Sequence, residues 1–133
     1  MKTVEIKTDH KMELVDITEE VRREVERSGV GEGLVNVYTR HTTASIVINE
    51  DEEGLLKDFL ASLQRIVPDD IYNYLHNRID NNASSHIRSL ILSPGVCIPI
   101  TAGGPWLGTW QSIFFLELDG PRRRSFAITI LGE

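Results

Sequence analysis

Apolar residues recur along this chain with two different periods, and this change of period constrains the fold more than any other feature. Segment 3–8 alternates apolar with polar residues, as a half-buried β-strand does. Segment 18–29 instead places Val21 and Val25 four positions apart, which is typical of one face of a helix. A chain that changes between these periods is expected to pack helices against a sheet, because both kinds of apolar face must be buried.

Six further segments are rich in β-branched and aromatic residues and predict strands. They are 12–17, 33–41, 44–50, 95–104, 108–120 and the end of the chain after the turn 118–124. The residues between 33–41 and 44–50 are too few for a crossover helix, so we expect an antiparallel hairpin there or a bend in one long strand. We expect a second hairpin through the turn 118–124.

Two further segments predict helices. Segment 51–68 carries a broad apolar face at helical spacing, with acids in its first turn and Pro68 at its end. Segment 85–94 predicts a short helix that Ser84 or Ser85 caps and that a proline ends.

The helix expected at 18–29 has Thr18 as its candidate N-cap and Gly29 just past its end. The last two predicted strands carry apolar residues on both faces, which fits a sheet covered by helices on one side and by a second layer or a subunit on the other. We therefore predict an α+β fold, a mainly antiparallel β-sheet or sandwich covered by helices, in a single domain over residues 1–133.

The charge balance limits the classes of partner. The 133 residues carry a formal net charge of −6, which argues against general affinity for nucleic acid or for an anionic membrane. No stretch approaches the roughly 20 apolar residues of a membrane span, and the N-terminal segment lacks the apolar run of a signal peptide. The single Cys97 lies in an apolar run and is predicted to be a buried small hydrophobe, so a reducing, cytoplasmic location is expected.

Three of the four histidines stand at the ends of predicted elements. His41 follows a strand, His76 precedes Asp80 in a polar stretch, and His86 opens a helix, whereas His10 is expected to be exposed. A rigid scaffold can aim side chains at such positions into one cleft. Neutral imidazoles near a carboxylate suit zinc or another divalent ion, and they suit acid–base catalysis near neutral pH equally well. Because the spacing matches no helical metal-binding motif, histidines that merely hydrogen-bond a loop are the alternative interpretation.

Two other stretches carry groups that can contact an anion. Segment 101–111 is rich in glycine and is either a plain connection between strands or a loop whose amides approach an anion. It contains no Walker sequence. The arginines at 122–124 follow a turn and are either solvated or in contact with a phosphate, whose oxygens suit a guanidinium group. Arg88, two residues after His86, is a second candidate for phosphate contact.

Four motifs in a fixed order carry a resemblance to a known family: HTTASIVINE at 41–50, HIRSLIL at 86–92, GTWQSIFFLELDGPRRR at 108–124 and the terminal ITILGE. In this combination the chain resembles the YjbQ family, also called the secondary thiamine-phosphate synthase family, from about residue 3 to residue 133. The resemblance implies an α+β fold with a mainly antiparallel sheet, assembled as a homotrimer. It also implies a polar pocket that gathers the family histidines, often interpreted as a metal or anion site.

The resemblance carries the family's positions onto particular residues of this chain: His41, Thr42, Ser45, Asn49, Glu50, His76, His86, Gly108, Thr109, Trp110, Gln111 and Glu133. Members commonly carry paired acids between the two later histidines, where this chain has Asp80 followed by Asn81. If both acids help to bind a cation, this chain holds the cation more weakly.

Residues and resemblance together lead to an assignment of roles. The expected catalytic groups are His41, His76, His86 and Glu50. The expected metal ligands, for zinc or magnesium, are His41, His76, His86 and Asp80. The expected substrate-binding residues are Asn49, Arg88, Thr109 and Gln111.

Two functions of different classes are compatible with these assignments. The first is a trimeric protein whose pocket binds a divalent metal and a phosphorylated small molecule, with weak thiamine-phosphate synthase activity, as the family's second name implies. That reaction joins a pyrimidine diphosphate to a thiazole phosphate and releases pyrophosphate, which needs cationic stabilisation of the leaving group. The second is a non-catalytic regulatory module that senses a phosphorylated metabolite or a metal. Turnover in vitro, or its absence despite binding, distinguishes them.

Overall fold

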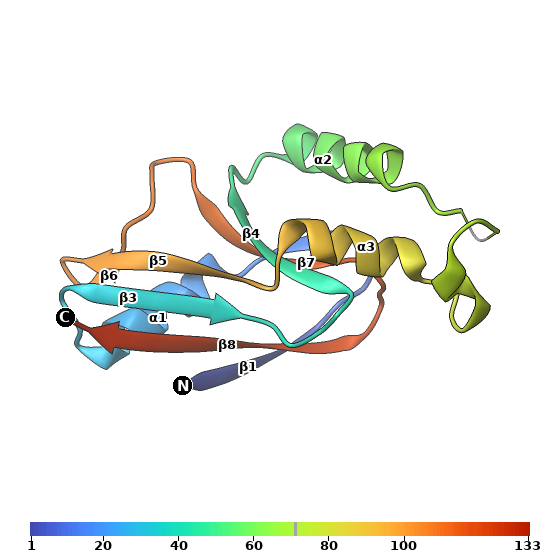
Figure 1. The fold of residues 1–133 in the computed structure, drawn as a ribbon. Helices are drawn as coiled ribbons and strands as arrows, with labels where there is room; N and C mark the ends of the chain where they lie inside the picture. Colours follow the sequence, from blue (N-terminus) through green and yellow to red (C-terminus); the bar gives the residue numbers. More distant parts are fainter. Residues whose placement is uncertain (71) are drawn as a thin grey trace.

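The fold consists of two antiparallel sheets in a computed structural model that describes residues 1–70 and 72–133 (Figure 1). The five-stranded sheet has the order β1 (Lys2–Lys7), β8 (Arg123–Gly132), β3 (Gly33–Tyr38), β5 (Gly95–Thr101) and β6 (Gly104–Pro105). The three-stranded sheet has the order β2 (Glu13–Asp16), β7 (Ser112–Glu117) and β4 (Ala44–Asn49). All strand pairs are antiparallel, which confirms the predicted α+β class with a mainly antiparallel sheet.

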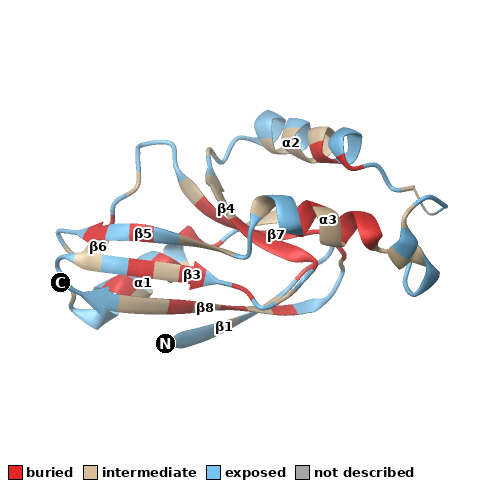
Figure 2. Cartoon of the chain, in the orientation of Figure 1, coloured by how far each residue is buried: buried red, intermediate tan, exposed pale blue. Residues whose placement is uncertain are grey.

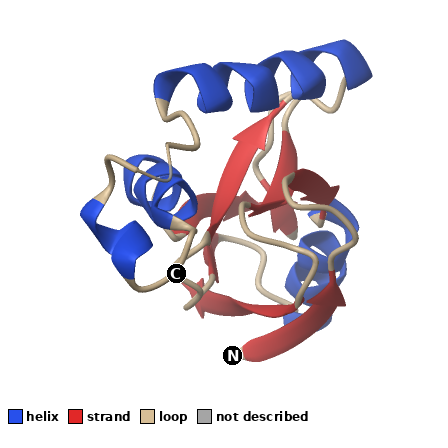
Figure 3. Ribbon diagram, turned by 90° about the vertical axis from the view of Figure 1, so that its right-hand side faces the viewer, coloured by secondary structure: helices blue, strands red, loops and turns tan. Residues whose placement is uncertain are grey.

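Helices cover the curved sheets on several sides (Figure 3). They are α1 (Thr18–Ser28), α2 (Glu53–Ile66), the short 3₁₀ helix η1 (Leu75–Arg78) and α3 (Ala83–Leu92). Helix α2 lies across the open side of β4, and α3 lies along β4 near its first residues (Figure 1). Within residues 1–70 and 72–133, none of the helices combines the length and the apolar character that crossing a membrane requires.

The main core lies between the two sheets and under α1 (Figure 2). On β3, Val35 and Val37 are fully buried, whereas Leu34 and Tyr38 point outward and remain 45% and 43% exposed. This alternation follows from the two-residue period of a strand with one covered face. A second, smaller cluster around Leu63 lies between α2 and the three-stranded sheet.

For residues 33–50 we expected a hairpin or a bend in one long strand, and for the turn 118–124 a hairpin. Neither hairpin is present among the described residues, because consecutive strands belong to different sheets. After β3, residues 39–43 carry the chain from the five-stranded to the three-stranded sheet, where β4 pairs with β7 and not with β3. Strands β7 and β8 are likewise in different sheets, since β8 pairs with β1 and β3. The chain therefore bends at both places, and the two sheets enclose the core between them.

Helix starts differ from the prediction by one or two residues. Helix α1 begins at Thr18 itself, because the carboxylate of Asp16 accepts from the backbone N–H of Thr18 (2.9 Å) and from its hydroxyl (2.6 Å). Helix α3 begins at Ala83, so Ser84 and Ser85 lie within it and do not cap it. The hydroxyl of Ser85 instead donates to the carbonyl of Leu118 (2.6 Å), which ties α3 to the end of β7.

The prediction for Cys97 was wrong. Cys97 is exposed, because it lies on the outward face of β5, whereas its neighbour Ile98 is buried in the core. Pro99 shares the outward face of Cys97, so the apolar run around them is a strand with one covered face.

Candidate functional site

His41 lies where β3 ends and the chain crosses to the other sheet. Strand β3 pairs with β8 only as far as Tyr38, which lies opposite Ala127. Two residues before Ala127 in β8, the backbone N–H of Ser125 donates to Nε2 of His41 (3.0 Å). The hydroxyl of Thr39 completes the arrangement, since it donates to the carbonyl of Ser125 (2.9 Å) and accepts from the backbone N–H of His41 (3.3 Å). The backbone N–H of Ser125 thus holds the ring near the end of β3 and the start of β8.

This hydrogen bond determines the protonation pattern of His41. Because Nε2 accepts a hydrogen bond, the neutral ring carries its proton on Nδ1 and can donate from there. Burial lowers the pKa of His41 from its ordinary value of 6.5, and the positive charge of Arg124 lowers it further. Arg40 and Arg122 act in the same direction, whereas Glu117 opposes them. The imidazole is therefore neutral at neutral pH and lies in a locally positive field, although the whole chain is acidic.

A buried ion pair lies beside His41. Arg124 donates from Nε and Nη2 to the carboxylate of Glu117 (2.8 and 2.5 Å), and both side chains are almost completely inaccessible. Nη2 of Arg124 also donates to Oγ1 of Thr43 (2.8 Å). Burial alone would raise the pKa of Glu117, but hydrogen bonds from Arg124 and Thr8 outweigh it and hold that pKa below its ordinary value. The pair joins β7 and β8 to residues 39–43, which present His41.

His86 and His41 line the same hollow, with a volume of about 390 Å³. His86 is in the first turn of α3, and further residues of that helix, Ser89 and Leu90, also line the hollow. The hydroxyl of Ser89 donates to the carbonyl of Ala44 (2.7 Å), so α3 is attached to β4 next to the hollow. The remaining lining residues come from the end of β3 and the residues after it, and from the turn after α3: Tyr38, Thr39, Arg40, Thr42, Ser93 and Pro94.

His76 lies against His86. Their ring centroids are 4.7 Å apart and the ring planes are inclined by 76°, an edge-to-face contact. Nε2 of His76 is buried and has no hydrogen-bond partner among the described residues, which is unusual for a buried polar atom. Two of the three predicted histidines therefore share the hollow, and the third contacts one of them.

The expected metal ligands do not form a complete coordination shell among the described residues. Among residues 1–70 and 72–133, no three side chains of histidine, cysteine, aspartate or glutamate lie together in a way that would hold a metal. Asp80 is exposed and lies just after η1, and Nε2 of His41 accepts from Ser125. Of the expected metal ligands, only His76 and His86 are in direct contact, through the edge of one ring and the face of the other.

The other candidate residues lie at the opposite end of β4. Strand β4 spans the six residues from Ala44 to Asn49. Asn49 therefore lies on the order of 20 Å from Ala44, which is the end of the strand nearer to His41 in the sequence. Glu50 continues from Asn49, and Asn49 pairs with Ser112, next to Gln111 at the start of β7. Gln111 accepts from the backbone N–H of Gly108 (2.8 Å), which closes a tight turn that contains Thr109. Within this chain these four residues are separate from the histidines, and their predicted roles stay predictions.

Arg88 is completely buried. Its Nε and Nη2 donate to the carbonyl of Val67 (3.1 and 2.6 Å), and Nη2 lies 3.3 Å from the carboxylate of Asp69. Nη1 lies 3.5 Å from the sulfur of Met12. Arg88 therefore attaches the end of α2 to α3. Its guanidinium is not accessible to a substrate in this chain.

The three consecutive arginines have three different environments. Arg124 is buried with Glu117, Arg122 pairs with Asp119 (3.0 Å), and Arg123 is exposed. A second hollow of about 440 Å³ lies on β1 and β8 and includes His41, Lys7 and Arg123. Sequence reasoning missed Arg40, which lines the histidine hollow. Its position directly before His41 was the available signal.

Two further family positions take part in local structure. The hydroxyl of the buried Ser45 donates to the carbonyl of Ser93, which lines the histidine hollow. Glu133 lies at another hollow, near Trp106 and Pro99, and its backbone N–H donates to the carbonyl of Glu32 (2.9 Å). Trp110 is 72% exposed.

Comparisons with known proteins agree over nearly the whole chain. The family model described as UPF0047 protein YjbQ-like matches residues 2–133. A UPF0047 protein of Methanothermobacter thermautotrophicus is 46% identical over 96% of this chain and 89% of its own length. The UPF0047 protein YugU of Bacillus subtilis is 35% identical over 99% of both chains. A crystal structure of a YbjQ-like protein of unknown function from Sulfolobus solfataricus superposes with a TM-score of 0.96 at 39% identity, covering 99% of this chain and 96% of that one.

Proposed function

The chain belongs to the UPF0047 YjbQ-like family, and we propose that the hollow between His41 and His86 binds a phosphorylated small molecule. The observation that carries this proposal is that two histidines from distant parts of the sequence line one hollow together with Arg40. A volume of about 390 Å³ is in the range of small-ligand sites. Hydroxyls of Thr42 and Ser93 add neutral hydrogen-bonding groups to the lining.

An anionic group suits this hollow better than a neutral one. Three arginines lower the pKa of His41, so an anion there gains from the same positive field. Nδ1 of His41 is free to donate, and the guanidinium of Arg40 suits paired phosphoryl oxygens. No acidic side chain lines the hollow among the described residues. A phosphate or diphosphate group is thus the ligand chemistry that these donors favour.

The two imidazoles of His76 and His86 support a divalent ion at the edge of this site. The unpartnered Nε2 of His76 is the atom that a metal would satisfy. Imidazole nitrogen favours zinc over magnesium, because magnesium prefers oxygen ligands. A metal bound there would neutralise phosphoryl charge. His76 and His86 would hold it, and phosphoryl oxygens or water would complete its coordination.

The family's second name leads us to propose a weak thiamine-phosphate-synthase-like transfer at this site. In that reaction, Arg40 and the protonated nitrogen of His41 would bind the departing pyrophosphate, and cationic donors near a leaving group lower the barrier to its departure. The non-catalytic regulatory module is the second candidate function, and the residues that line the hollow in one chain favour it. Among the described residues, Glu50 and Asp80 are not among those that line the hollow, so no carboxylate is placed there as a general base.

We also propose a homotrimer. The outward face of the five-stranded sheet exposes Leu34 and Leu131 side by side, with Pro99 on the other flank of Leu34. Tyr38, on the same face, also lines the histidine hollow. A contiguous apolar face of this kind is typical of a subunit contact. A subunit packed there would lie next to the histidines.

Calorimetric titration with inorganic pyrophosphate, with and without zinc, tests the binding proposal. We expect saturable binding to the native protein and a loss of about 10–100-fold in affinity in His86→Gln, because a charge-assisted hydrogen bond contributes about 1.5–3 kcal/mol. His10→Gln is the matched control and should bind like the native protein. Equal affinities in the two variants would contradict the site.

Turnover separates the two candidate functions. Incubation with the pyrimidine diphosphate and the thiazole phosphate should release pyrophosphate slowly, and the protein should support growth of a strain that lacks the normal synthase. Pyrophosphate binding with neither turnover nor growth would leave the regulatory module as the function of the same site.

A further inference from the structure

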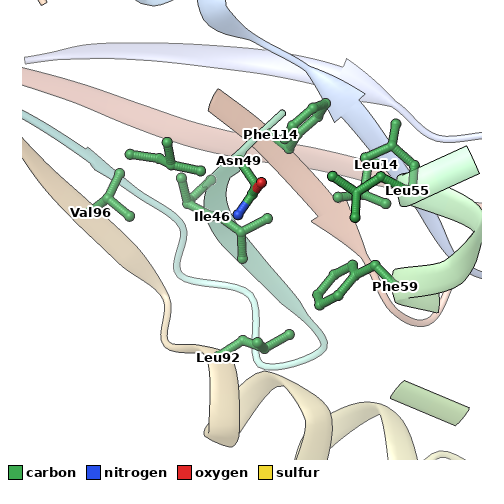
Figure 4. Close-up of a pocket in the computed structure, with 11 residues that line it drawn as sticks. Leu14, Ile46, Asn49, Leu55, Phe59, Leu92, Val96 and Phe114 are labelled. Carbon is green, nitrogen blue, oxygen red and sulfur yellow. The ribbon is translucent and has the colours of Figure 1, made fainter. Parts of the chain in front are cut away.

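A hollow with an apolar lining lies apart from the histidines. Its volume is about 500 Å³, and it lies under α2, between β4 and the start of β5. The lining is almost wholly hydrocarbon and includes Val47, Leu55, Leu56 and Phe59. Asn49 is its only polar residue (Figure 4).

Helix α2 leaves this hollow open because it contacts the sheets mainly through its second half. Leu63 is the only residue of α2 that is buried, and it packs on Leu116 and Leu118. In the first half, Leu55 is 38% exposed and Phe59 faces the hollow (Figure 4). The apolar side chains of α2 and the sheets do not meet here, and the concave space between them has room for a small molecule.

Strand topology explains where the hollow comes from. Strand β4 is the last strand of its sheet, so its second edge has no strand partner. Strand β5 has β6 beside it only at Ile100 and Thr101, so its first half is also unpaired on that side. Residues of both strands line the hollow, and residues of α2 line it on a further side.

Asn49 gives the hollow one directional group. Its Oδ1 accepts from the backbone N–H of Glu50 (2.8 Å), which fixes the amide. The Nδ2 group accordingly faces the hollow and donates to no described residue (Figure 4). A single donor in an apolar lining selects a ligand with one acceptor, such as a carbonyl oxygen.

The acidic residues that connect β4 to α2 disfavour an anionic ligand. Residues 50–53 are four consecutive acids, and they connect Asn49 to α2, both of which line the hollow. A carboxylate or phosphate that entered here would meet like charge. These acids contrast with the positive surroundings of His41, so the two hollows are suited to different ligands.

We propose that the hollow under α2 is a second binding site, for a neutral, largely apolar small molecule whose carbonyl oxygen accepts from Nδ2 of Asn49. Burial of the ligand between Val47, Leu56 and Phe59 supplies the affinity. The amide of Asn49 supplies the orientation. The site is independent of phosphate binding at the histidines.

A fluorescence titration with prodan, a neutral aromatic ketone, tests this site on the full-length protein. We expect saturable binding with a blue-shifted emission. Val47→Trp, which fills the hollow from β4, should weaken binding at least about tenfold. Leu56→Trp fills it from the loosely packed half of α2 and carries the same test if Val47→Trp does not fold, as judged by circular dichroism.

Asn49→Leu tests the directional group, because it removes the amide and keeps a similar volume. Prodan affinity should fall by about 2–12-fold, the equivalent of one net hydrogen bond. The affinity for diphenylhexatriene, a hydrocarbon without an acceptor, should not fall. Equal losses for both dyes would contradict the role of Asn49.

Ile91→Ala is the control for adsorption of dye to an exposed apolar side chain outside the hollow, and it should bind prodan like the native protein. The proposal is overturned if prodan does not bind, or if Ile91→Ala weakens binding and the two tryptophan variants do not. It is also overturned if the tryptophan variants change the oligomeric mass, because a second copy of the chain would then occupy the hollow.

Discussion

Replacement of Arg124 by methionine should unfold this protein far more readily than replacement of any exposed arginine. The guanidinium makes two hydrogen bonds to Glu117 (2.8 and 2.5 Å) and two to Thr43 (2.8 and 3.2 Å). The side chain of Glu117 has no solvent exposure, so Arg124→Met leaves a buried carboxylate that keeps only Thr8 and two backbone N–H groups as donors. Removing one partner of a buried ion pair costs about 3–5 kcal/mol.

Urea unfolding at pH 7, at one protein concentration, measures this loss. An unfolding entropy of about 2.1 cal/mol/K per residue over 133 residues converts it to a fall in Tm of about 11–18 °C. Arg123→Met is the matched control, because Arg123 is the exposed neighbour on the same strand, and it should stay within about 0.5 kcal/mol of the native protein. Arg124→Met combined with Glu117→Leu should recover part of the loss, since no unpaired charge remains.

The pH dependence gives a second test of the same reasoning. The pKa of Glu117 in the folded protein lies below its ordinary 4.5, so its stabilising contribution is complete above pH 4.5 and is lost as the pH falls further. The difference between the native protein and Arg124→Met should therefore be largest at neutral pH and should narrow below pH 4.5. A loss under about 1 kcal/mol at pH 7, or one equal to that of Arg123→Met, would refute the assignment of the buried pair.

Three further outcomes are expected. Arg88→Met leaves the carbonyl of Val67 without its donor and should cost about 1–3 kcal/mol in urea unfolding; an unchanged stability would contradict the anchoring role. His41 has a folded pKa below the 6.5 of the unfolded chain, so the unfolded state takes up the proton first and stability should fall as the pH drops below 6.5. His41→Gln should remove that part of the slope, and an identical slope would contradict it. Leu34→Asp should shift the native mass in light scattering toward the 15.0 kDa monomer, whereas an unshifted trimer would exclude this face as the contact.

Element types were largely predictable from the sequence, because apolar spacing depends on local geometry. The face of α2 could be derived from its helical period, and the outward position of Cys97 could have been derived too. Ile98 and Ile100 alternate with it on β5, so the buried isoleucines force Cys97 outward. The general rule that cysteine is buried outweighed this local signal and gave the wrong prediction.

Strand pairing was not predictable, because it depends on contacts between distant residues. Nothing in residues 39–43 distinguishes a hairpin from a crossing between sheets. The crossing occurs because β8 occupies the place beside β3 that a hairpin partner would take.

The candidate site was predictable in its histidines and not in its arginines. The sequence predicts His41, His76 and His86 at the ends of strands and helices, and the structure places the three histidines in one region. Sequence alone cannot reveal that Val67 presents a carbonyl to Arg88, since the two are connected only through the packing of α2 on α3.

Histidine side-chain NMR during a pyrophosphate titration tests the central claim most directly, because the chain has only four histidines. The imidazole resonances of His41, His76 and His86 should shift together with one binding constant, while that of His10 should stay fixed. Stationary resonances for the three, or a shift of His10 as large as theirs, would contradict a shared anion site.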